Sequence, residues 1–163
     1  MSAEKMNRIT GDGRIRVGEI CGHDIGEIAG LEGNIFPDAW SRQALSETFA
    51  RPYAVILGAW LKDRLAGYLI LYYVADEGEI VRVGVAEHNR RQGIGRALLN
   101  CAEELLKLKG GERLLLDVRE SNAAAIALYK KQGFSEDGIR KKFYTDPVED
   151  AILMSHKIEK IHL

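Results

Sequence analysis

The sequence predicts an α+β fold, in which about four helices flank one mixed, mostly antiparallel sheet of about seven strands. Three observations predict it. Residues 53–74 contain two β-branched and aromatic runs around a short polar turn, which is typical of an antiparallel hairpin. Residues 93–108 carry apolar side chains at helical spacing. Strands and helices then alternate to the end of the chain, so both pack around one layered core.

The first part of the chain predicts one short strand and two short helices. Residues 15–17 can open a strand. Residues 24–31 have apolar side chains at 25, 28, 29 and 31 and a capping aspartate at the start. Residues 35–40 form a proline-marked loop with two aromatic side chains. Ser41 then caps a second helix, which ends before Pro52 because proline disfavours helical backbone in the residue before it.

The middle of the chain predicts the body of the sheet and the longest helix. Residues 53–61 and 65–74 form the two strands of the hairpin, with residues 62–64 as its turn. Residues 79–85 form a third strand. Residues 93–108 form a helix with one apolar face, and the two glycines that follow end it.

The last third predicts a strand, a helix and a closing hairpin. Residues 114–118 are an apolar, buried strand. Residues 122–132 form a helix that the first residue caps and Gly133 ends. Residues 139–144 and 151–158 pair as two antiparallel strands.

Length and charge limit the class of protein. The 163 residues suit one domain, and we expect a disordered or loosely held tail over residues 1–13 before a domain over residues 14–163. The 23 Lys and Arg nearly balance the 24 Asp and Glu, which argues against binding to nucleic acid or to anionic membranes. The sequence has neither a run of 18 apolar residues nor the apolar stretch of a signal peptide. We therefore expect a cytoplasmic protein.

The cysteines and histidines predict no metal site. Cys21 and Cys101 form no CxxC pair, and the four histidines are scattered along the chain. Cys101 lies in an apolar helical pattern, so we expect a buried structural thiol.

Residues 83–96 have the pattern of an anion-binding turn. A strand ends there, an arginine-rich loop follows, and Gly93 and Gly95 open a helix. Glycines let the backbone approach a ligand closely, and the first helical N–H groups are unpaired donors, so the turn suits a phosphate or pyrophosphate. The same residues also fit a tight turn with solvated arginines. The turn is neither a P-loop, because GxxxxGK is missing, nor a dinucleotide motif, because the third glycine is missing.

Four motifs resemble the GNAT acetyltransferase superfamily. Residues 90–95 match its Gln/Arg-x-x-Gly-x-Gly/Ala motif, which binds the CoA pyrophosphate. Residues 117–134 resemble the VRxSNxxAIxLYxxxGF stretch of its RimI-type members, which acetylate the N-terminal alanine of a small-subunit ribosomal protein. Residues 36–41 resemble their FPxxWS loop, and residues 143–154 resemble their tyrosine-plus-EDA ending. The resemblance covers about residues 15–158 and implies the α/β/α-layered GNAT fold.

The resemblance also implies how acetyl-CoA would bind. Main-chain groups of Val83, Gly84 and Val85 would hold the pantetheine arm. Asn122 would hydrogen-bond the cofactor, and Tyr129 would protonate or hydrogen-bond the leaving thiolate; the two lie on one helix face. Tyr129 also fits a core aromatic with a satisfied hydroxyl. The residues that would cradle the pyrophosphate are Arg90, Arg91, Gln92, Gly93, Ile94, Gly95 and Arg96.

Two carboxylates are candidates for the general base. RimI-type proteins have a glutamate where this chain has Asp117, which is one methylene shorter, so a bridging water would complete the contact with the amine. Glu79 lies where histone-acetylating members of the superfamily have their catalytic glutamate. Each has a structural alternative. Asp117 could pair with an arginine, and Glu79 could simply face solvent.

The resemblance places the acceptor beside Phe36, Trp40 and Tyr144, between which an extended peptide N-terminus could enter. Taken alone, these residues also fit core or rim aromatics. A free α-amine titrates near pKa 8, so about a tenth is neutral at pH 7, whereas a lysine near 10.4 is far less available. A weakly placed base therefore favours an α-amine acceptor.

The predicted function is acetyl-CoA-dependent acetylation of a protein N-terminal α-amine, by direct attack within a ternary complex and without a metal. The acceptor could be a small-subunit ribosomal protein. Two alternatives stay open. The same fold could acetylate a lysine, a polyamine or a small amine antibiotic. The chain could also be a non-catalytic acyl-CoA-binding module, which only Asp117 in place of glutamate supports.

Overall fold

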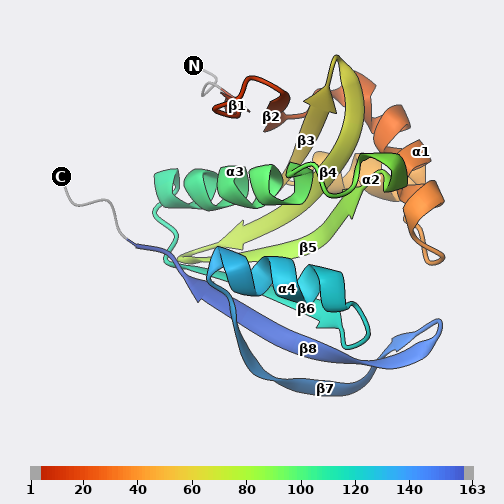
Figure 1. Ribbon diagram of the computed structural model, residues 1–163, viewed down its shortest axis with the longest axis vertical. Coiled ribbons are helices and arrows are strands. Elements are labelled where there is room, and N and C mark those ends of the chain that lie inside the picture. The colour runs from red at the N-terminus through yellow and green to blue at the C-terminus, as the bar shows by residue number, and fades with distance from the viewer. Residues whose placement is uncertain (1–4, 160–163) are drawn as a thin grey trace.

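The computed structural model describes residues 5–159, whose strands form one mixed sheet in the order β1-β2-β3-β4-β5-β6-β8-β7 (Figure 1). Neighbouring strands are antiparallel except for β5 and β6. The β-branched and aromatic runs of the sequence form the buried central strands. The strands of this part of the chain are β1 (Asn7–Ile9), β2 (Ile15–Glu19), β3 (Ala54–Leu61), β4 (Arg64–Val74), β5 (Glu77–Val85), β6 (Arg113–Arg119), β7 (Ser135–Thr145) and β8 (Val148–Lys157).

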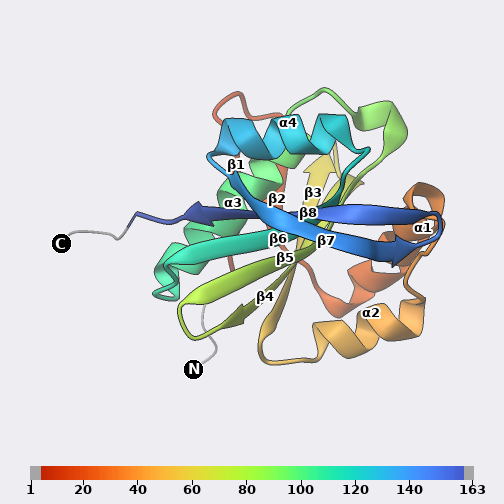
Figure 2. The same ribbon diagram turned by 90° about the horizontal axis from the view of Figure 1, so that it is seen from below.

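Two pairs of helices cover the two faces of the sheet (Figure 1, Figure 2). One face packs against α1 and α2, and the other packs against α3 and α4. The helices are α1 (Ile25–Ile35), α2 (Arg42–Phe49), α3 (Ile94–Leu108) and α4 (Ala123–Gln132), with short 3₁₀ helices η1 (Gly22–Asp24) and η2 (Glu87–Asn89). None of the helices between residues 5 and 159 is long and apolar enough to cross a membrane.

The sheet separates two apolar cores. In β3, Ile56 belongs to the core under α1 and α2, and Leu57 belongs to the core under α3 and α4. Tyr68 and Leu69 of β4 divide in the same way, as the alternation of side chains along a strand requires. Each fully buried aliphatic side chain contributes about 1.5–3 kcal/mol. The two cores therefore fix the sheet between its helix layers.

The strands β5 and β6 pair over only part of their length. Their parallel ladder joins residues 77–80 to residues 113–116, and beyond it the two strands diverge (Figure 1). Directly after this ladder, the pairing of β5 with β4 shifts register, and Val81 is left without a partner on β4. Such a bulge bends a strand and re-aims its side chains. The result is a split in the sheet between residues 81–85 and residues 117–119.

The N-terminal segment is more ordered than the sequence predicts. Residues 7–9 form β1, which pairs with β2, and Met6 is buried in the core. The prediction of a loose tail over residues 1–13 is therefore wrong for this part, and residues 1–4 lie outside the described residues. Three residues are too few to show an alternating pattern, so the extra strand gives no signal in the sequence.

Candidate functional site

The edge of β5 at the split offers main-chain groups that pair with no neighbouring strand, although the carbonyl of Val85 accepts a hydrogen bond from Arg90 Nε (3.4 Å). The N–H of Ala86 donates to the carbonyl of Ala66 on β4 (2.8 Å). Main-chain groups of successive residues point to opposite sides of a strand. Gly84 therefore faces β4, and Val83 and Val85 direct their main-chain groups into the split. A ligand with amide groups can pair with this edge as another strand would.

The turn between β5 and α3 presents a row of free N–H groups. Gly93 is the N-cap of α3 and has a left-handed φ of 86°. Arg91 is also left-handed, with φ at 65°. No acceptor within the described part of the chain takes the N–H groups of residues 91–96. They lie at the positive end of the helix dipole, where a phosphate binds readily.

The side chains of the turn add positive charge. Arg90, Arg91 and Arg96 are exposed, and the Nε of Arg90 also donates to a main-chain carbonyl of β5 (3.4 Å). The side-chain oxygen of Gln92 accepts a hydrogen bond from Arg14 (3.0 Å), which ties the turn to the loop between β1 and β2. The predicted cradle residues thus form one continuous cationic turn.

Gly95 and Ile94 serve the packing of α3. Ile94 is buried in the core. A Cβ on Gly95 would lie 2.9 Å from the Leu128 side chain of α4, so the glycine allows the two helices to approach. The close approach of a phosphate is one reason for a glycine at this position, and the contact with the end of the Leu128 side chain is a second one.

Tyr129 lies on the inner side of α4. Its ring is buried and packs against Phe134 at a centroid distance of 5.7 Å. Its hydroxyl makes no hydrogen bond to any described residue. Burial raises the pKa of Tyr129 to about 12, and the charge of Tyr144 adds to the rise. The hydroxyl therefore keeps its proton and is free to donate it to a ligand.

Asn122 has a structural role at the start of α4. Its Oδ1 accepts the N–H of Ala125 (3.2 Å), and its own N–H donates to the carbonyl of Arg119 (2.9 Å). The side chain is exposed, and its Nδ2 has no partner among residues 5–159. Capping thus holds the side chain in place and leaves two N–H donors free.

Asp117 and Glu79 lie on the same face of the sheet, one on each strand of the split. Glu79 is in register with Leu115, so strand geometry separates the Cα atoms of Glu79 and Asp117 by about 8 Å. Neither carboxylate has a hydrogen bond or ion pair within the described chain. Asp117 is half-buried and Glu79 is exposed. Asp117 therefore does not form the arginine pair that the sequence left open.

The β7–β8 hairpin brings Tyr144 to the Asp117 side of the split. The Arg119 guanidinium lies over the Tyr144 ring at 4.2 Å, and it also bonds the Asp146 carbonyl (3.0 Å) and Glu149 (3.3 Å). Burial raises the pKa of Tyr144 to about 12, and the Asp117 charge adds to the rise. Arg119 thus holds the hairpin so that Tyr144 lies beside a candidate base.

The loop between α1 and α2 carries Phe36 and Trp40, which are half-buried. The Arg82 guanidinium of β5 lies 3.6 Å over the Phe36 ring and 5.9 Å from the Trp40 ring. The charge of Arg82 also acts on the pKa of Tyr144, in the lowering direction. The three predicted acceptor residues therefore approach the split from its two sides.

Three residues that hold these elements were not singled out from the sequence: Glu32, Arg82 and Arg119. Glu32 bonds Arg82, fifty positions further along the chain. The sequence carries a weak signal for this pair. Glu32 lies four residues after Ile28 on the apolar face of a helix, and Arg82 lies within an apolar strand. A charge in such a place needs a partner, but the pattern does not say which one.

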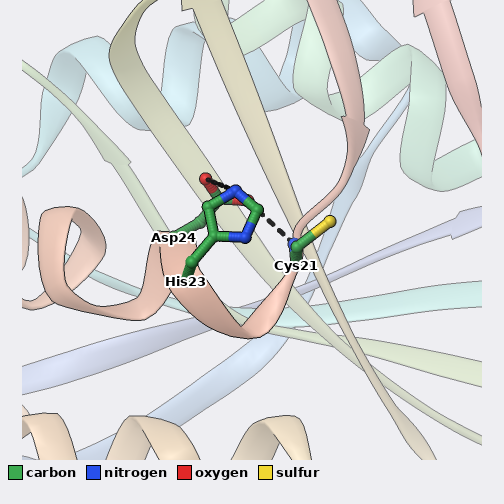
Figure 3. Close-up of side chains that lie close together, drawn as sticks. All are labelled: Cys21, His23 and Asp24. Carbon is green, nitrogen blue, oxygen red and sulfur yellow. Dashed lines mark hydrogen bonds and ion pairs between the residues drawn. The ribbon is translucent and has the colours of Figure 1, made fainter.

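Cys21, His23 and Asp24 gather at the start of α1, with their ligand atoms within 4.8 Å of one another (Figure 3). Their grouping was not foreseen from the sequence. One carboxylate oxygen of Asp24 accepts the Cys21 N–H (2.8 Å), and the other lies 3.6 Å from His23 Nε2. The three residues belong to one exposed turn, and the Asp24 hydrogen bond caps the 3₁₀ helix there.

The free strand edge, the cationic turn and the Tyr129 hydroxyl suit the three parts of an acyl-CoA molecule. Its pantetheine amides match a strand edge, its pyrophosphate matches free N–H groups and arginines, and its sulfur matches a hydroxyl donor. On the other side of the split, free carboxylates and aromatic rings suit an amine. Fold and site together define an acyl-CoA-dependent N-acetyltransferase.

Residues 25–134 match the acetyltransferase (GNAT) family, and the chain belongs to this family. The chain is 38% identical over 132 residues to a Bacillus subtilis (strain 168) protein named as a candidate ribosomal protein bS18-alanine N-acetyltransferase, covering 80% of this chain and 87% of that protein. It is 32% identical over 146 residues to the Mycobacterium tuberculosis N-alpha-acetyltransferase RimI, covering 86% and 90%.

A crystal structure shows the same fold. The ribosomal-protein-S18-alanine N-acetyltransferase from Escherichia coli superposes with a TM-score of 0.83 at 31% identity, covering 91% of this chain and 96% of that one. The predicted fold, family and enzyme class are therefore confirmed. Members of this family use acetyl-CoA as the acetyl donor.

Proposed function

We propose that this protein acetylates the α-amine of protein N-termini, with the N-terminal alanine of a small-subunit ribosomal protein as its acceptor. The observation that carries the proposal is the meeting of Tyr129, Tyr144 and Asp117 at the split. It combines a free hydrogen-bond donor for a leaving group, an aromatic wall and a free carboxylate for an amine. The names of the relatives support alanine as the acceptor residue and bS18 as the acceptor protein.

The donor side of the split would hold acetyl-CoA through main-chain groups. Bound acetyl-CoA would supply a thioester, whose carbonyl carbon accepts the amine and whose sulfur leaves. Val83 and Val85 would pair with the pantetheine arm in extended form. The N–H groups of residues 91–96, with the exposed arginines around them, would bind the pyrophosphate. The free Nδ2 of Asn122 would give one more hydrogen bond.

The acceptor side would prepare the amine. Asp117 would accept the proton that the amine loses, through one water where the shorter side chain does not reach. Glu79 lies nearer the closed end of the split, and its exposed charge would attract the cationic N-terminus. Phe36, Trp40 and Tyr144 would border the extended peptide. The neutral amine then attacks directly, so positioning supplies most of the rate.

Tyr129 would stabilise the leaving sulfur by donating a hydrogen bond. Its pKa of about 12 lies above that of an ordinary thiol, about 8.5, so a thiolate would not remove its proton. A donor of this kind lowers the barrier because its bond strengthens as negative charge develops on the sulfur.

The acceptor class can be tested with two peptides and intact-mass spectrometry. One peptide starts with a free alanine and lacks lysine, and the other is N-terminally blocked and contains one lysine. After incubation with acetyl-CoA, we expect one acetyl group on the first peptide alone. Acetylation of the lysine peptide alone would replace the proposal with a lysine acetyltransferase. Acetyl-CoA binding without acetylation of either peptide would also overturn it.

A ribosomal acceptor would also set where the enzyme works. Ribosomal proteins are made and assembled in the bacterial cytoplasm, so we propose that this enzyme acts there. The near balance of acidic and basic residues suits recognition of a protein end more than of ribosomal RNA.

A further inference from the structure

Glu32 is a fully buried carboxylate in α1 that joins four segments of the chain. It accepts hydrogen bonds from the Tyr68 hydroxyl of β4, from the Arg82 guanidinium of β5 and from the main-chain N–H of Trp40. The Arg82 Nη2 lies 2.6 Å and the Trp40 nitrogen lies 2.8 Å from its Oε2. A single side chain therefore connects a helix, two central strands and the loop over residues 36–41.

Arg82 makes the same connection from the strand. Besides Glu32, its Nη2 donates to the main-chain carbonyl (3.4 Å) and to Oδ1 (3.3 Å) of Asp38, and its guanidinium covers Phe36 at 3.6 Å. Arg82 directly follows the bulge at Val81, where β5 leaves β6. The loop is thus attached to β5 at the point where the split begins.

We propose that Glu32 and Arg82 are positioning residues that hold the acceptor loop, residues 36–41, against the strand that carries the thioester. The next residue, Val83, directs its main chain into the split, so any shift of Arg82 against the loop moves the acceptor wall against the donor. The inference rests on the proposed function, since it takes this loop as a wall of the acceptor groove. Attack by the amine requires close alignment with the thioester. The pair should therefore affect the rate of amine attack and leave the affinity for acetyl-CoA unchanged.

Stability alone does not explain the pair. A buried ion pair adds little net stability over apolar residues of similar size, because taking two charges out of water costs about as much as their attraction returns. Burial acts to lower the pKa of Arg82, but the hydrogen bond to Glu32 and the charges of Glu32 and Asp38 raise it overall. The guanidinium therefore stays charged, and its rigid fork fixes direction as well as distance.

The test compares Glu32→Gln, Arg82→Met and the double variant. Each single variant leaves a buried charge without its counter-charge, whereas the double variant removes both charges and should recover most of the lost stability. We expect the double variant to keep the wild-type KM for acetyl-CoA. Its kcat/KM for an alanine-starting peptide should stay about tenfold below wild type. Peptide kinetics that recover together with stability would overturn the proposal, because the pair would then serve folding alone.

The matched control is the exposed ion pair between Arg8 and Glu104, which joins β1 to α3 at 2.8 Å. Glu104→Gln with Arg8→Met removes the same two charges. We expect nearly unchanged kinetics and stability, as is usual for surface pairs. A loss of peptide turnover equal to that of the Glu32/Arg82 double variant would overturn the proposal.

Amide hydrogen exchange separates this inference from the proposed function, because it needs no turnover. The Glu32/Arg82 double variant removes the Arg82 bonds to Asp38 and replaces the carboxylate that accepts the Trp40 N–H with a neutral amide. Residues 36–41 should therefore exchange about tenfold faster in this variant than in wild type. The control should match wild type. If wild type fails to acetylate the peptide, the proposed function fails, and hydrogen exchange alone tests this inference. Faster exchange in the double variant supports the attachment of the loop, and unchanged exchange overturns it.

Discussion

Tyr129 and Asp117 each carry a polar group that no described residue hydrogen-bonds. Tyr144 raises the pKa of Tyr129, and Asp117 raises the pKa of Tyr144. Most buried polar groups in proteins have partners. Two free groups near one tyrosine are therefore available for a ligand that enters the split. Asn122 adds a third, because capping uses its oxygen and leaves its Nδ2 free.

Tyr129→Phe should lower kcat about 100-fold, because it removes the donor that strengthens as the sulfur becomes negative. The ring contact with Phe134 remains, so acetyl-CoA affinity and folding should change little. Single-turnover rates and an acetyl-CoA titration measure the two effects. Tyr73→Phe is the control, because that hydroxyl bonds the Pro52 carbonyl (3.1 Å) at the surface. Wild-type kcat in Tyr129→Phe would remove the leaving-group role.

Asp117→Asn should lower kcat/KM for the peptide about 100-fold and remove the base from the low-pH limb of the rate profile. Glu79→Gln should keep the shape of the profile and raise only the KM for the peptide, because it removes an attracting charge. Since the pKa of Tyr129 is about 12, neither variant should show a falling limb from this hydroxyl below about pH 11. The opposite pattern in the two variants would make Glu79 the base.

The residues of the site differ in how far the sequence could predict them. Asp117 and Tyr129 were found because residues 117–134 carry a contiguous motif. Glu32 and Arg82 were not found because their contact joins distant positions and leaves no local pattern. The spacing of apolar residues predicts which face of a helix or strand a residue occupies. It does not predict which distant residue contacts it in the folded protein.

At the scale of elements, α3 carries a left-handed glycine at each end. Gly93 precedes it with φ at 86°, and Gly110 follows it with φ at 80°. A Cβ at either position would meet nothing within 4 Å. The two glycines are therefore equivalent for folding and differ in what lies beside them, since only Gly93 borders the free N–H groups of the predicted phosphate turn.

Gly93→Asn should weaken acetyl-CoA binding about tenfold, or about 1.4 kcal/mol, because its side chain enters the space where the phosphates would bind. Folding stability should change little, since asparagine tolerates the left-handed conformation. Gly110→Asn introduces the same side chain at the other end of the helix and should leave binding unchanged. Calorimetric titration and thermal unfolding check both. Equal affinities in the two variants would contradict the phosphate assignment.

Element types were predicted better than element ends. The spacing of residues 24–31 predicted a helix, but α1 continues to Ile35. The added turn contains Glu32, which tertiary partners bury. Residues 139–144 were predicted as a strand, and β7 starts earlier, at Ser135. Pairing with β8 extends it although its residues are polar and exposed. In both cases distant contacts extend an element beyond its own sequence pattern.

At the scale of the whole molecule, burial keeps several weak acids protonated. It raises the pKa of Cys101, Tyr129 and Tyr144 each to about 12, and it also raises the pKa of Tyr68. The unfolded chain would release these protons near the ordinary values of about 8.5 for cysteine and about 10 for tyrosine. The folded state therefore binds more protons than the unfolded state at alkaline pH.

Stability should consequently fall at high pH. The contribution of these groups is fully present below about pH 8.5 and is lost as the pH rises toward about 12. Each group that is deprotonated in the unfolded chain but still protonated in the folded one lowers the free energy of unfolding by about 1.4 kcal/mol per pH unit. Urea unfolding at constant ionic strength measures the slope. Tyr129→Phe should make it shallower, and Tyr53→Phe, at an exposed ring, should not.

The short ladder between β5 and β6 also bears on the order in which substrates bind. Among the described strands, it is the one direct pairing between the half of the sheet over β1–β5 and the half over β6–β8. Val83 belongs to the first half and Tyr129 to the second, so acetyl-CoA bound by both, as proposed, would connect the two sides of the split. The two proposed walls of the acceptor groove, the loop of residues 36–41 and Tyr144, also come from different halves. We therefore expect compulsory-order kinetics, in which acetyl-CoA binds first and sets the width of the groove that the peptide then enters.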